Sequence, residues 1–584
     1  MFRKMYYVLL VLVKCLMMSN AENITRPTVQ LSFGSVKGWR MESNVSNGTY
    51  MNVFRGIPYA QPPIGSLRFK APEPVQNFIE EKDLSQADWP PCPQRIGGYG
   101  ATTNYSEDCL ILNIYTPEMA KSGDILPVMF WIHGGALSSG SSSMFAPDFL
   151  VEKNIIFVSI NYRVGALGFL NLETDDVPGN AGLKDQNLAL QWVKREISNF
   201  GGDPAKVTIF GESAGSTCVS FHYISPRSQG LFSKAICESG NAFSETTFLE
   251  TGYLDRAIAL SNKLNCTDKS GSVNLTCMQN VNVDDIVTYQ DLSLSDEYTI
   301  PGNNIVFTAT PEKISNTAIL TDTPQNMLNN LIKSNCTRIP LIMGINHDEG
   351  TVNVQGNSSF YSELPSKLQY FIPTAIRLKK SSDEIKSNIA SIYKYYFNNT
   401  VPSLSNLDGY IKIYGDKMFG VCTSVFARKL INFNQIYLYH FDFIGNFTQN
   451  RYPGMNIANK VGHGDELNYL FYTQSLNQTA IPENSTTKTT LRRIVKMWTD
   501  FANYGNPTLD ATKDTVLNGF KWTPISKDSI SYMRVTQDLK MISENFLEDE
   551  VTFWNNIDTI NSNCSKLSIS LVCLVCSLVF ILKI

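Results

Sequence analysis

A serine on a tight turn restricts the fold of this chain more than any other part of the sequence. Residues 211–215 read Gly-Glu-Ser-Ala-Gly and lie between a short apolar run, Val207–Phe210, and a segment with a helical pattern. This G-x-S-x-G arrangement is typical of a strand-to-helix turn that strains the serine backbone and presents the hydroxyl above a sheet. We expect glycine at positions 211 and 215 because side chains there would collide with the neighbouring strand and helix.

Further short apolar runs, each bounded by turn signals, are predicted to be buried strands. They are Leu126–Ile132, Ile155–Ile160, Ile339–Met343 and Ile436–Phe443, and a helical pattern over Asp185–Phe200 lies among them. Alternation of strands and helices predicts an α/β fold with a central, mostly parallel sheet covered by helices on both faces. In such sheets the functional side chains gather at the carboxyl ends of the strands.

The composition is that of a folded globular protein. The chain has 584 residues, of which 43% are hydrophobic and 17% charged, and a chain of this size can bury a large core. It has no long linker, low-complexity block or internal repeat, so we expect one domain over residues 22–560. The net charge is −4 and Lys and Arg form no run of five or more, which argues against nucleic acid as a partner. A structural zinc site is not expected, since no C-x-x-C pair lies near a matching pair of histidines.

The N-terminus has the features of a secretory signal peptide, predicted over residues 1–21. Arg3 and Lys4 precede the apolar run Tyr6–Val13, and small residues end the segment at Ser19-Asn20-Ala21. Thirteen N-x-S/T sequons support this route and predict a glycosylated surface. Their asparagines are Asn23, Asn44, Asn47, Asn104, Asn265, Asn274, Asn335, Asn357, Asn398, Asn446, Asn477, Asn484 and Asn563.

The C-terminus, residues 561–584, is predicted to be a GPI-attachment signal. A polar stretch at 561–566 precedes the apolar tail Leu567–Leu582, after which only Lys583 and Ile584 remain. Two alternatives stay open: a single spanning helix with a two-residue stub, and a buried C-terminal helix. The predicted location is therefore the secretory pathway and the outer cell surface, with membrane contact only through this lipid anchor or tail.

Nine cysteines remain once those in the two terminal segments are set aside, and an oxidising compartment favours disulfides over metal ligation. Cys92 with Cys109, and Cys266 with Cys277, are the close pairs. Each would close a loop of fewer than 20 residues, a constraint that contributes about 3 kcal/mol in the chain-entropy model. The other five are expected to be free, buried thiols: Cys218, Cys237, Cys336, Cys422 and Cys564.

A serine nucleophile needs an adjacent base, which is almost always an imidazole. Among five histidines, His463 lies late in the chain between two glycines, where a loop can direct its ring at Ser213. His440 is expected in a strand of the core and His222 on the helix after the serine. His133 begins a glycine-rich turn and His347 lies in an acidic loop.

The imidazole in turn needs a carboxylate that fixes its tautomer. The loop after Ile339–Met343 offers Asp348 and Glu349, and spacing does not separate the two. Negative charge that develops on a carbonyl oxygen needs donors fixed in advance. We assign this oxyanion hole to the backbone amides of Gly135, Ala136 and Ala214.

Together these motifs resemble the type-B carboxylesterase/cholinesterase family of α/β-hydrolases, from about Val36 to Val535. The resemblance implies the triad Ser213, Glu349 and His463, so family likeness favours Glu349 over Asp348. It also implies the disulfides Cys92–Cys109 and Cys266–Cys277. Besides the serine turn, its landmarks are residues 54–60 (Phe-Arg-Gly-Ile-Pro-Tyr-Ala), 106–110 (Ser-Glu-Asp-Cys-Leu), 161–165 (Asn-Tyr-Arg-Val-Gly), 201–204 (Gly-Gly-Asp-Pro) and 505–507 (Gly-Asn-Pro).

Departures from the family pattern narrow the expected activity. Tyr99 stands where cholinesterases carry the tryptophan that faces choline, which weakens the case for cation–π binding of choline. Ala136 replaces a third glycine and keeps its amide donor while narrowing the oxyanion hole. Glu212 precedes the serine, as in general carboxylesterases and cholinesterases, whereas juvenile hormone esterases usually have glutamine there. Cys422 has no partner for the third cholinesterase disulfide.

These features predict a serine carboxylesterase that acts on neutral, hydrophobic esters through an acyl-enzyme, without metal or organic cofactor. The partner is a small-molecule ester, and the sequence leaves the natural ester and the oligomeric state open. The competing hypotheses are a cholinesterase and, because the family includes members that have lost the triad, a catalytically idle adhesion ectodomain.

Overall fold

The computed structural model describes residues 26–557 except 79, 86–89, 96–101, 103, 294–304, 335–337, 355–357, 373, 378, 405, 449–458 and 510–513. The predicted signal peptide, the predicted C-terminal attachment signal and Tyr99 lie outside the described residues. Within these ranges no helix is both long and apolar enough to cross a bilayer.

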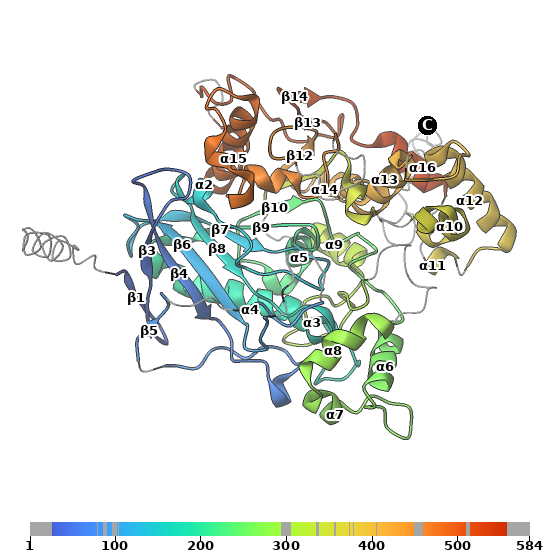
Figure 1. Ribbon diagram of the computed structural model, residues 1–584, viewed down its shortest axis with the longest axis horizontal. Coiled ribbons are helices and arrows are strands. Elements are labelled where there is room, and N and C mark those ends of the chain that lie inside the picture. Colours follow the sequence, from blue (N-terminus) through green and yellow to red (C-terminus); the bar gives the residue numbers. More distant parts are fainter. Residues whose placement is uncertain are drawn as a thin grey trace, which may run out of the picture.

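The described residues form an eleven-stranded sheet that runs through the centre of the molecule (Figure 1). Strands β8, β7, β9, β10, β11, β12 and β13 are parallel neighbours in that order, while β3, β4 and β6 at one edge and β14 at the other pair antiparallel. This confirms the predicted α/β-hydrolase fold with its mostly parallel sheet. In sheet order the strands are β14 (Leu539–Ile542), β13 (Tyr532–Val535), β12 (Ile436–Phe441), β11 (Leu341–Asn346), β10 (Lys234–Glu238), β9 (Gly202–Glu212), β7 (Leu126–Ile132), β8 (Ile156–Ile160), β6 (Ile111–Pro117), β4 (Tyr50–Pro58) and β3 (Trp39–Glu42). A smaller sheet joins β1 (Thr28–Leu31), β2 (Gly34–Lys37) and β5 (Lys82–Asp83).

Helices cover both faces of the large sheet (Figure 1). The principal ones are α2 (Asp148–Val151), α3 (Gly165–Phe169), α4 (Ala181–Glu196), α5 (Ala214–Ile224), α6 (Tyr253–Lys263), α7 (Leu275–Asn280), α8 (Val283–Tyr289), α9 (Pro324–Lys333), α10 (Ser358–Lys367), α11 (Thr374–Arg377), α12 (Ser382–Phe397), α13 (Asp408–Gly415), α14 (Val421–Leu430), α15 (Thr486–Tyr504) and α16 (Glu548–Asn556).

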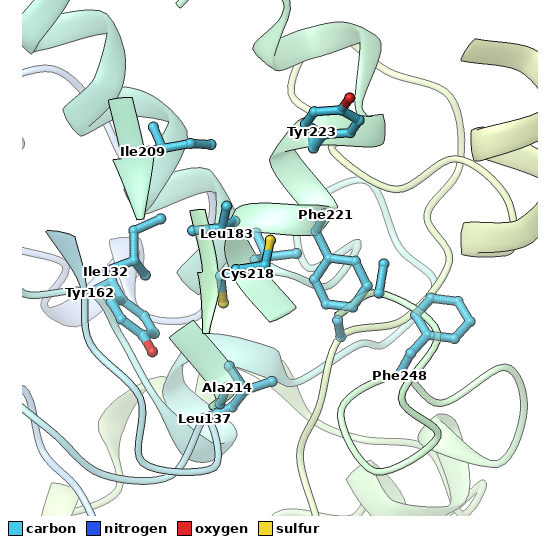
Figure 2. Close-up of a cluster of buried hydrophobic side chains, with 14 of the residues drawn as sticks. Ile132, Leu137, Tyr162, Leu183, Ile209, Ala214, Cys218, Phe221, Tyr223 and Phe248 are labelled. Atoms are coloured by element: carbon cyan, nitrogen blue, oxygen red, sulfur yellow. The ribbon is translucent and has the colours of Figure 1, made fainter. Parts of the chain in front are cut away.

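Strand β7 shows how one sequence serves both faces, because successive side chains of a strand point to opposite sides. Val128, Phe130 and Ile132 pack in the core cluster that contains α4 and α5 side chains. Met129 and Trp131 pack in the second cluster, with side chains of α2 and α15. Figure 2 shows part of the first cluster around α5, where Cys218 lies among apolar side chains. The apolar run is continuous because both faces are buried.

The predicted central elements lie close to the observed ones. Leu126–Ile132 is β7 in full, and the run at Val207–Phe210 is the inner part of the longer β9. The run predicted from Ile339 begins as β11 two residues later, at Leu341, and extends to Asn346. The helix predicted over Asp185–Phe200 is observed as α4 with a following 3₁₀ turn, Ile197–Phe200.

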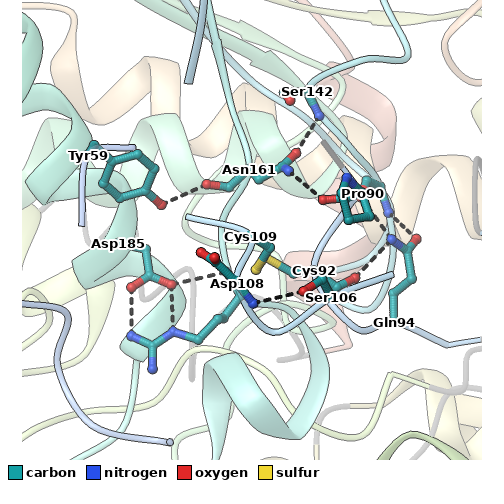
Figure 3. Close-up of a disulfide and its surroundings, with 12 residues drawn as sticks. Tyr59, Pro90, Cys92, Gln94, Ser106, Asp108, Cys109, Ser142, Asn161 and Asp185 are labelled. Carbon is teal, nitrogen blue, oxygen red and sulfur yellow. Dashed lines mark hydrogen bonds and ion pairs between the residues drawn. A yellow bond between two sulfur atoms is a disulfide. The ribbon is translucent and has the colours of Figure 1, made fainter. Parts of the chain in front are cut away.

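Both predicted disulfides are present, Cys92–Cys109 and Cys266–Cys277. Figure 3 shows the first disulfide and the hydrogen bonds around it, which join this part of the chain to residues that follow β7 and β8. The Gly140 amide donates a hydrogen bond to Gln94 Oε1 at 3.0 Å, and Asn161 Nδ2 donates to the Pro90 carbonyl at 3.3 Å. Cys218, Cys237 and Cys422 are buried thiols that form no disulfide with the described residues, as expected; Cys336 and Cys564 lie outside the described residues.

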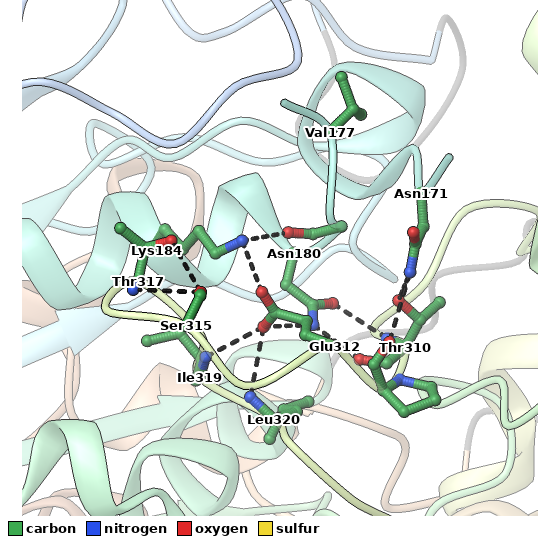
Figure 4. Close-up of polar contacts among 12 residues, drawn as sticks. Asn171, Val177, Asn180, Lys184, Thr310, Glu312, Ser315, Thr317, Ile319 and Leu320 are labelled. Atoms are coloured by element: carbon green, nitrogen blue, oxygen red, sulfur yellow. Dashed lines mark hydrogen bonds and ion pairs between the residues drawn. The ribbon is translucent and has the colours of Figure 1, made fainter. Parts of the chain in front are cut away.

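A buried ion pair fixes the loop that follows residues 294–304 (Figure 4). Glu312 Oε2 lies 2.5 Å from Lys184 Nζ, and both side chains are almost completely buried. Glu312 Oε1 accepts hydrogen bonds from Asn180 Nδ2 at 2.8 Å and from the Ile319 amide at 3.0 Å. The carboxylate therefore joins this loop to the start of α4, where Asn180 takes a left-handed conformation.

Candidate active site

Ser213 occupies the turn between β9 and α5 with φ 59° and ψ −126°. This strained conformation is the one that the G-x-S-x-G motif predicts. The two flanking glycines are required for space: a Cβ on Gly211 would lie 2.5 Å from the Ile132 carbonyl oxygen, and one on Gly215 only 2.1 Å from it. The Ser213 amide donates to the Glu238 carbonyl at 2.8 Å, so β10 holds the turn from the other side.

His463 and Glu349 are brought together, although 114 positions separate them in sequence. Nδ1 of the imidazole lies 2.5 Å from Glu349 Oε2. The side chains are nearly buried, with 7% of His463 and 1% of Glu349 exposed. A carboxylate in this place favours the tautomer with its proton on Nδ1, in which Nε2 carries the lone pair that can accept a proton.

Glu349, rather than Asp348, faces the imidazole. Its second oxygen, Oε1, accepts hydrogen bonds from Ser239 Oγ at 2.5 Å and from the Asn346 amide at 2.6 Å. Asp348 turns the other way: its Oδ2 accepts the Val461 amide at 3.0 Å, and its Oδ1 pairs with a lysine at 3.1 Å. Asp348 thus anchors the segment just before His463 while Glu349 meets the ring.

Nε2 of His463 lies 3.0 Å from Oε1 of Glu212, the residue directly before Ser213. The same imidazole therefore contacts one carboxylate at each nitrogen. Glu212 is itself nearly buried, with 8% of its side chain exposed. Once the ring has taken up a proton, both carboxylates stabilise its positive charge.

Two more buried glutamates lie near this pair, and sequence reasoning missed both. Burial, helped by the charge of Glu212, raises the pKa of Glu238 to about 8, and its Oε1 accepts the Trp498 indole N–H at 2.5 Å. Burial first, then Glu212, also raises the pKa of Glu466. A carboxyl group directly after the apolar residues 235–237 was the only sequence signal for Glu238.

The predicted oxyanion loop passes beside the serine. A Cβ on Gly134 would lie 3.1 Å from Ser213 Cβ. The next two residues adopt positive φ, 101° at Gly135 and 58° at Ala136, and no acceptor among the described residues takes up their amides. Ala214 begins α5, and the first amides of a helix have no partner in a preceding turn. All three predicted donors are therefore placed around one end of β7 and β9.

The rings of the other histidines have contacts of their own. His222 is fully buried between a serine hydroxyl and a glutamine amide oxygen, 2.8 and 2.9 Å from its two nitrogens. The His133 ring stacks on Tyr162 at 4.3 Å, and its Nδ1 lies 2.8 Å from the Gly134 carbonyl. His440 lies on β12, and its ring is 5.2 Å from that of His347. Burial lowers the pKa of His133 to about 4 and of His222 and His440 to about 3.

A last feature of the site has no counterpart in the sequence predictions. The ring of Phe419 lies 4.5 Å from the imidazole of His463, centroid to centroid.

Among the described residues, no group of three or more His, Cys, Asp or Glu side chains is placed to bind a metal ion.

Comparison with known proteins identifies the family of this chain. Residues 25–554 match the model of the Carboxylesterase family. Esterase B1 of Culex pipiens is 34% identical over 507 residues, which cover 83% of this chain and 89% of that protein. Juvenile hormone esterase of Tribolium castaneum is 32% identical over 83% of this chain and 84% of its own length, and cholinesterase of Mus musculus is 29% identical over 94% and 90%. A match over nearly the whole chain, on this sheet and this serine turn, means that the protein belongs to the carboxylesterase family of α/β-hydrolases and is an esterase.

Proposed function

We propose that the protein is a serine carboxylesterase that hydrolyses neutral, hydrophobic carboxylic esters through an acyl-enzyme. The observation that carries the proposal is the buried 2.5 Å contact between His463 Nδ1 and Glu349 Oε2, in a site where Ser213 has the strained backbone of a nucleophile. Ser213, Glu349 and His463 then form the catalytic triad.

The reaction begins when Nε2 of His463 takes the Ser213 hydroxyl proton while Oγ bonds to the ester carbonyl carbon. Negative charge moves to the carbonyl oxygen, which accepts hydrogen bonds from the amides of Gly135, Ala136 and Ala214; one such donor is commonly worth about 3–4 kcal/mol. The tetrahedral adduct collapses as Nε2 returns the proton to the departing alcohol. Water then repeats the sequence on the acyl-enzyme and releases the acid.

Charge on the imidazole is balanced from two sides during these steps. Glu349 faces Nδ1 throughout, and the Ser239 hydroxyl and Asn346 amide orient that carboxylate by donating to its other oxygen. Glu212, 3.0 Å from Nε2, stabilises the imidazolium that exists once the serine proton has been taken.

The substrate class is tested by a series of nitrophenyl esters of increasing acyl length, set beside acetylcholine and its neutral isostere, 3,3-dimethylbutyl acetate. We expect kcat/KM to rise with acyl length over the first members, because each buried CH₂ contributes about 0.8 kcal/mol, and the neutral isostere to be hydrolysed at least as well as acetylcholine. A clear preference for acetylcholine would mean that the protein is a cholinesterase. If the folded protein hydrolyses none of these esters, the result would favour the hypothesis of a catalytically idle adhesion ectodomain.

The proposal includes a single esterase domain over residues 22–560, N-glycosylation and a C-terminal GPI anchor after signal-peptide removal. Exposure of the sequons supports the glycosylated surface, because every sequon asparagine that the structure describes is exposed: Asn44, Asn47, Asn104, Asn265, Asn274, Asn398, Asn446, Asn477 and Asn484. Protein expressed in eukaryotic cells is expected to lose apparent mass with an N-glycosidase. Phosphatidylinositol-specific phospholipase C is expected to release it from the cell surface, whereas retention on membranes after that treatment would favour a spanning helix.

A further inference from the structure

A π-helical turn lies against the candidate triad. Helices α13 and α14 are continuous through Asp416–Gly420, which has π-helical hydrogen bonding. Such a turn adds one residue to the helical period and is frequent at functional sites. All five of its residues are buried.

Phe419, in this turn, contacts the imidazole of His463. The two rings are 4.5 Å apart at their centroids and tilted by 32°, within the range of favourable ring contacts. Phe419 and His463 are both buried, with 6% of each residue exposed. Glu349 meets the edge of the imidazole at Nδ1 and Glu212 meets it at Nε2, so Phe419 covers a face that neither carboxylate holds.

The support behind Phe419 is rigid. A Cβ on Gly350, next to the triad carboxylate, would lie 1.9 Å from the Ile411 carbonyl oxygen, so α13 packs directly on that turn. Beside it, Asn353 Nδ2 donates to Met418 Sδ at 2.9 Å and the Tyr410 hydroxyl donates to the Asn353 carbonyl at 2.5 Å. The helices that present Phe419 and the turn that presents Glu349 therefore form one packed unit.

The backbone beside the histidine is held by hydrogen bonds: Asn346 Nδ2 donates to the Gly462 carbonyl at 2.8 Å, and the Gly462 amide donates to Asp465 Oδ2 at 2.8 Å. His463 lies between Gly462 and Gly464, and Gly464 has φ 74°. The His463 amide makes a long contact, 3.4 Å, with Thr351 Oγ1. These contacts place the residue, but χ2 of a histidine is broad, so the orientation of the ring depends on the groups that contact the side chain.

We propose that Phe419 is a positioning residue, whose ring holds the His463 imidazole in the orientation that joins Glu349 to Ser213. This inference rests on the proposed function. The main rival role is that Phe419 only lines the substrate pocket, and the two roles differ in what they change: loss of positioning lowers kcat for every substrate, whereas loss of a pocket wall changes KM according to the acyl group.

The test compares Phe419→Leu with Phe426→Leu. Phe426 is a fully buried phenylalanine on α14 that packs on Phe243 at 5.0 Å, so its replacement reproduces the loss of a buried ring next along the same helices. We expect Phe419→Leu to lower kcat about 10- to 100-fold, the range for small misplacements of reacting groups, by the same factor for short and long nitrophenyl esters and with KM nearly unchanged. Labelling of Ser213 by a small organophosphate should slow by a similar factor. Phe419→Tyr, which keeps the ring, should recover most of kcat, and Phe426→Leu should leave kcat within about twofold while lowering Tm at least as much.

Three results would overturn the inference: unchanged kcat in Phe419→Leu, an equal loss in Phe426→Leu, or a loss confined to KM of long-chain esters. Ser213→Ala separates this test from that of the proposed function. If Ser213→Ala retains turnover, the proposed function fails; if it is inactive while Phe419→Leu is normal, only the positioning role fails.

Discussion

Replacement of Ser213 by alanine is expected to lower kcat for ester hydrolysis by roughly 10⁴- to 10⁶-fold, the range for removal of a triad nucleophile. Only Oγ is removed, and the turn is held by backbone contacts that alanine keeps: the Ser213 amide to the Glu238 carbonyl, and the Ser213 carbonyl to the Thr217 amide at 3.0 Å. The variant should therefore fold with nearly the stability of the natural protein. Steady-state hydrolysis of a nitrophenyl ester, read beside a thermal unfolding curve, measures both quantities.

The matched control is Ser220→Ala. Ser220 is a buried serine two turns along α5, and its hydroxyl donates to the Thr217 carbonyl at 2.8 Å. Its replacement removes one hydrogen bond, worth about 1 kcal/mol of stability, and should leave kcat within a few-fold. Substantial turnover by Ser213→Ala, or an equal loss in both variants, would contradict the assignment of the nucleophile.

Glu349→Gln is expected to lower kcat by about 10⁴-fold, the effect known for the corresponding change in a triad acid. The amide keeps the shape of the side chain but carries no charge to balance an imidazolium. It also brings N–H donors to Nδ1, which favour the tautomer with the proton on Nε2, where the serine proton has to go. The measurement is kcat for the same ester, with KM recorded to show that substrate still binds.

Asp348→Asn is the control for Glu349→Gln, because it removes the charge of the neighbouring carboxylate. The two acids are neighbours in sequence and equally suited by chemistry, but Asp348 binds Lys460 and the Val461 amide and not the imidazole. We expect Asp348→Asn to lower Tm, because it weakens an anchor of the loop before His463, and to keep kcat within about tenfold. A larger catalytic loss in Asp348→Asn than in Glu349→Gln would show that the acid has been assigned to the wrong residue.

The sequence predicts those parts of the site that depend on residues adjacent in the chain, and it does not predict those that depend on the turn or packing of distant residues. The serine turn is local: strand, two glycines and helix are adjacent in sequence, and the collisions that require those glycines are with the next strand. The acid is different, because a 3₁₀ turn starting at Glu349 decides which of two adjacent carboxylates faces inward, and no hydrophobic period reports a turn of that kind. The resemblance to a family, rather than the spacing, favoured the residue that the structure brings to the ring.

The features that were missed depend on distant packing. Phe419, which contacts His463, lies in the π-helical turn Asp416–Gly420, and a regular hydrophobic period assigns such a phenylalanine to an ordinary core position. Glu238 and Glu466 become unusual only through burial beside Glu212. The antiparallel edge formed by β3, β4 and β6 was also not predicted, since its strands mix polar and apolar residues and lack the continuous apolar runs of the parallel strands.

The relay of Ser213, His463 and Glu349 is tested most directly by mapping where a small organophosphate attaches. After reaction and trypsin digestion, fragmentation of the peptide that spans residues 207–227 separates Ser213 from the other serines it contains. We expect one phosphoryl adduct, on Ser213, formed in step with loss of esterase activity and at least a thousandfold more slowly in Glu349→Gln and in His463→Ala. Loss of activity with the adduct on another residue, or labelling of Ser213 at an undiminished rate in those two variants, would contradict the relay.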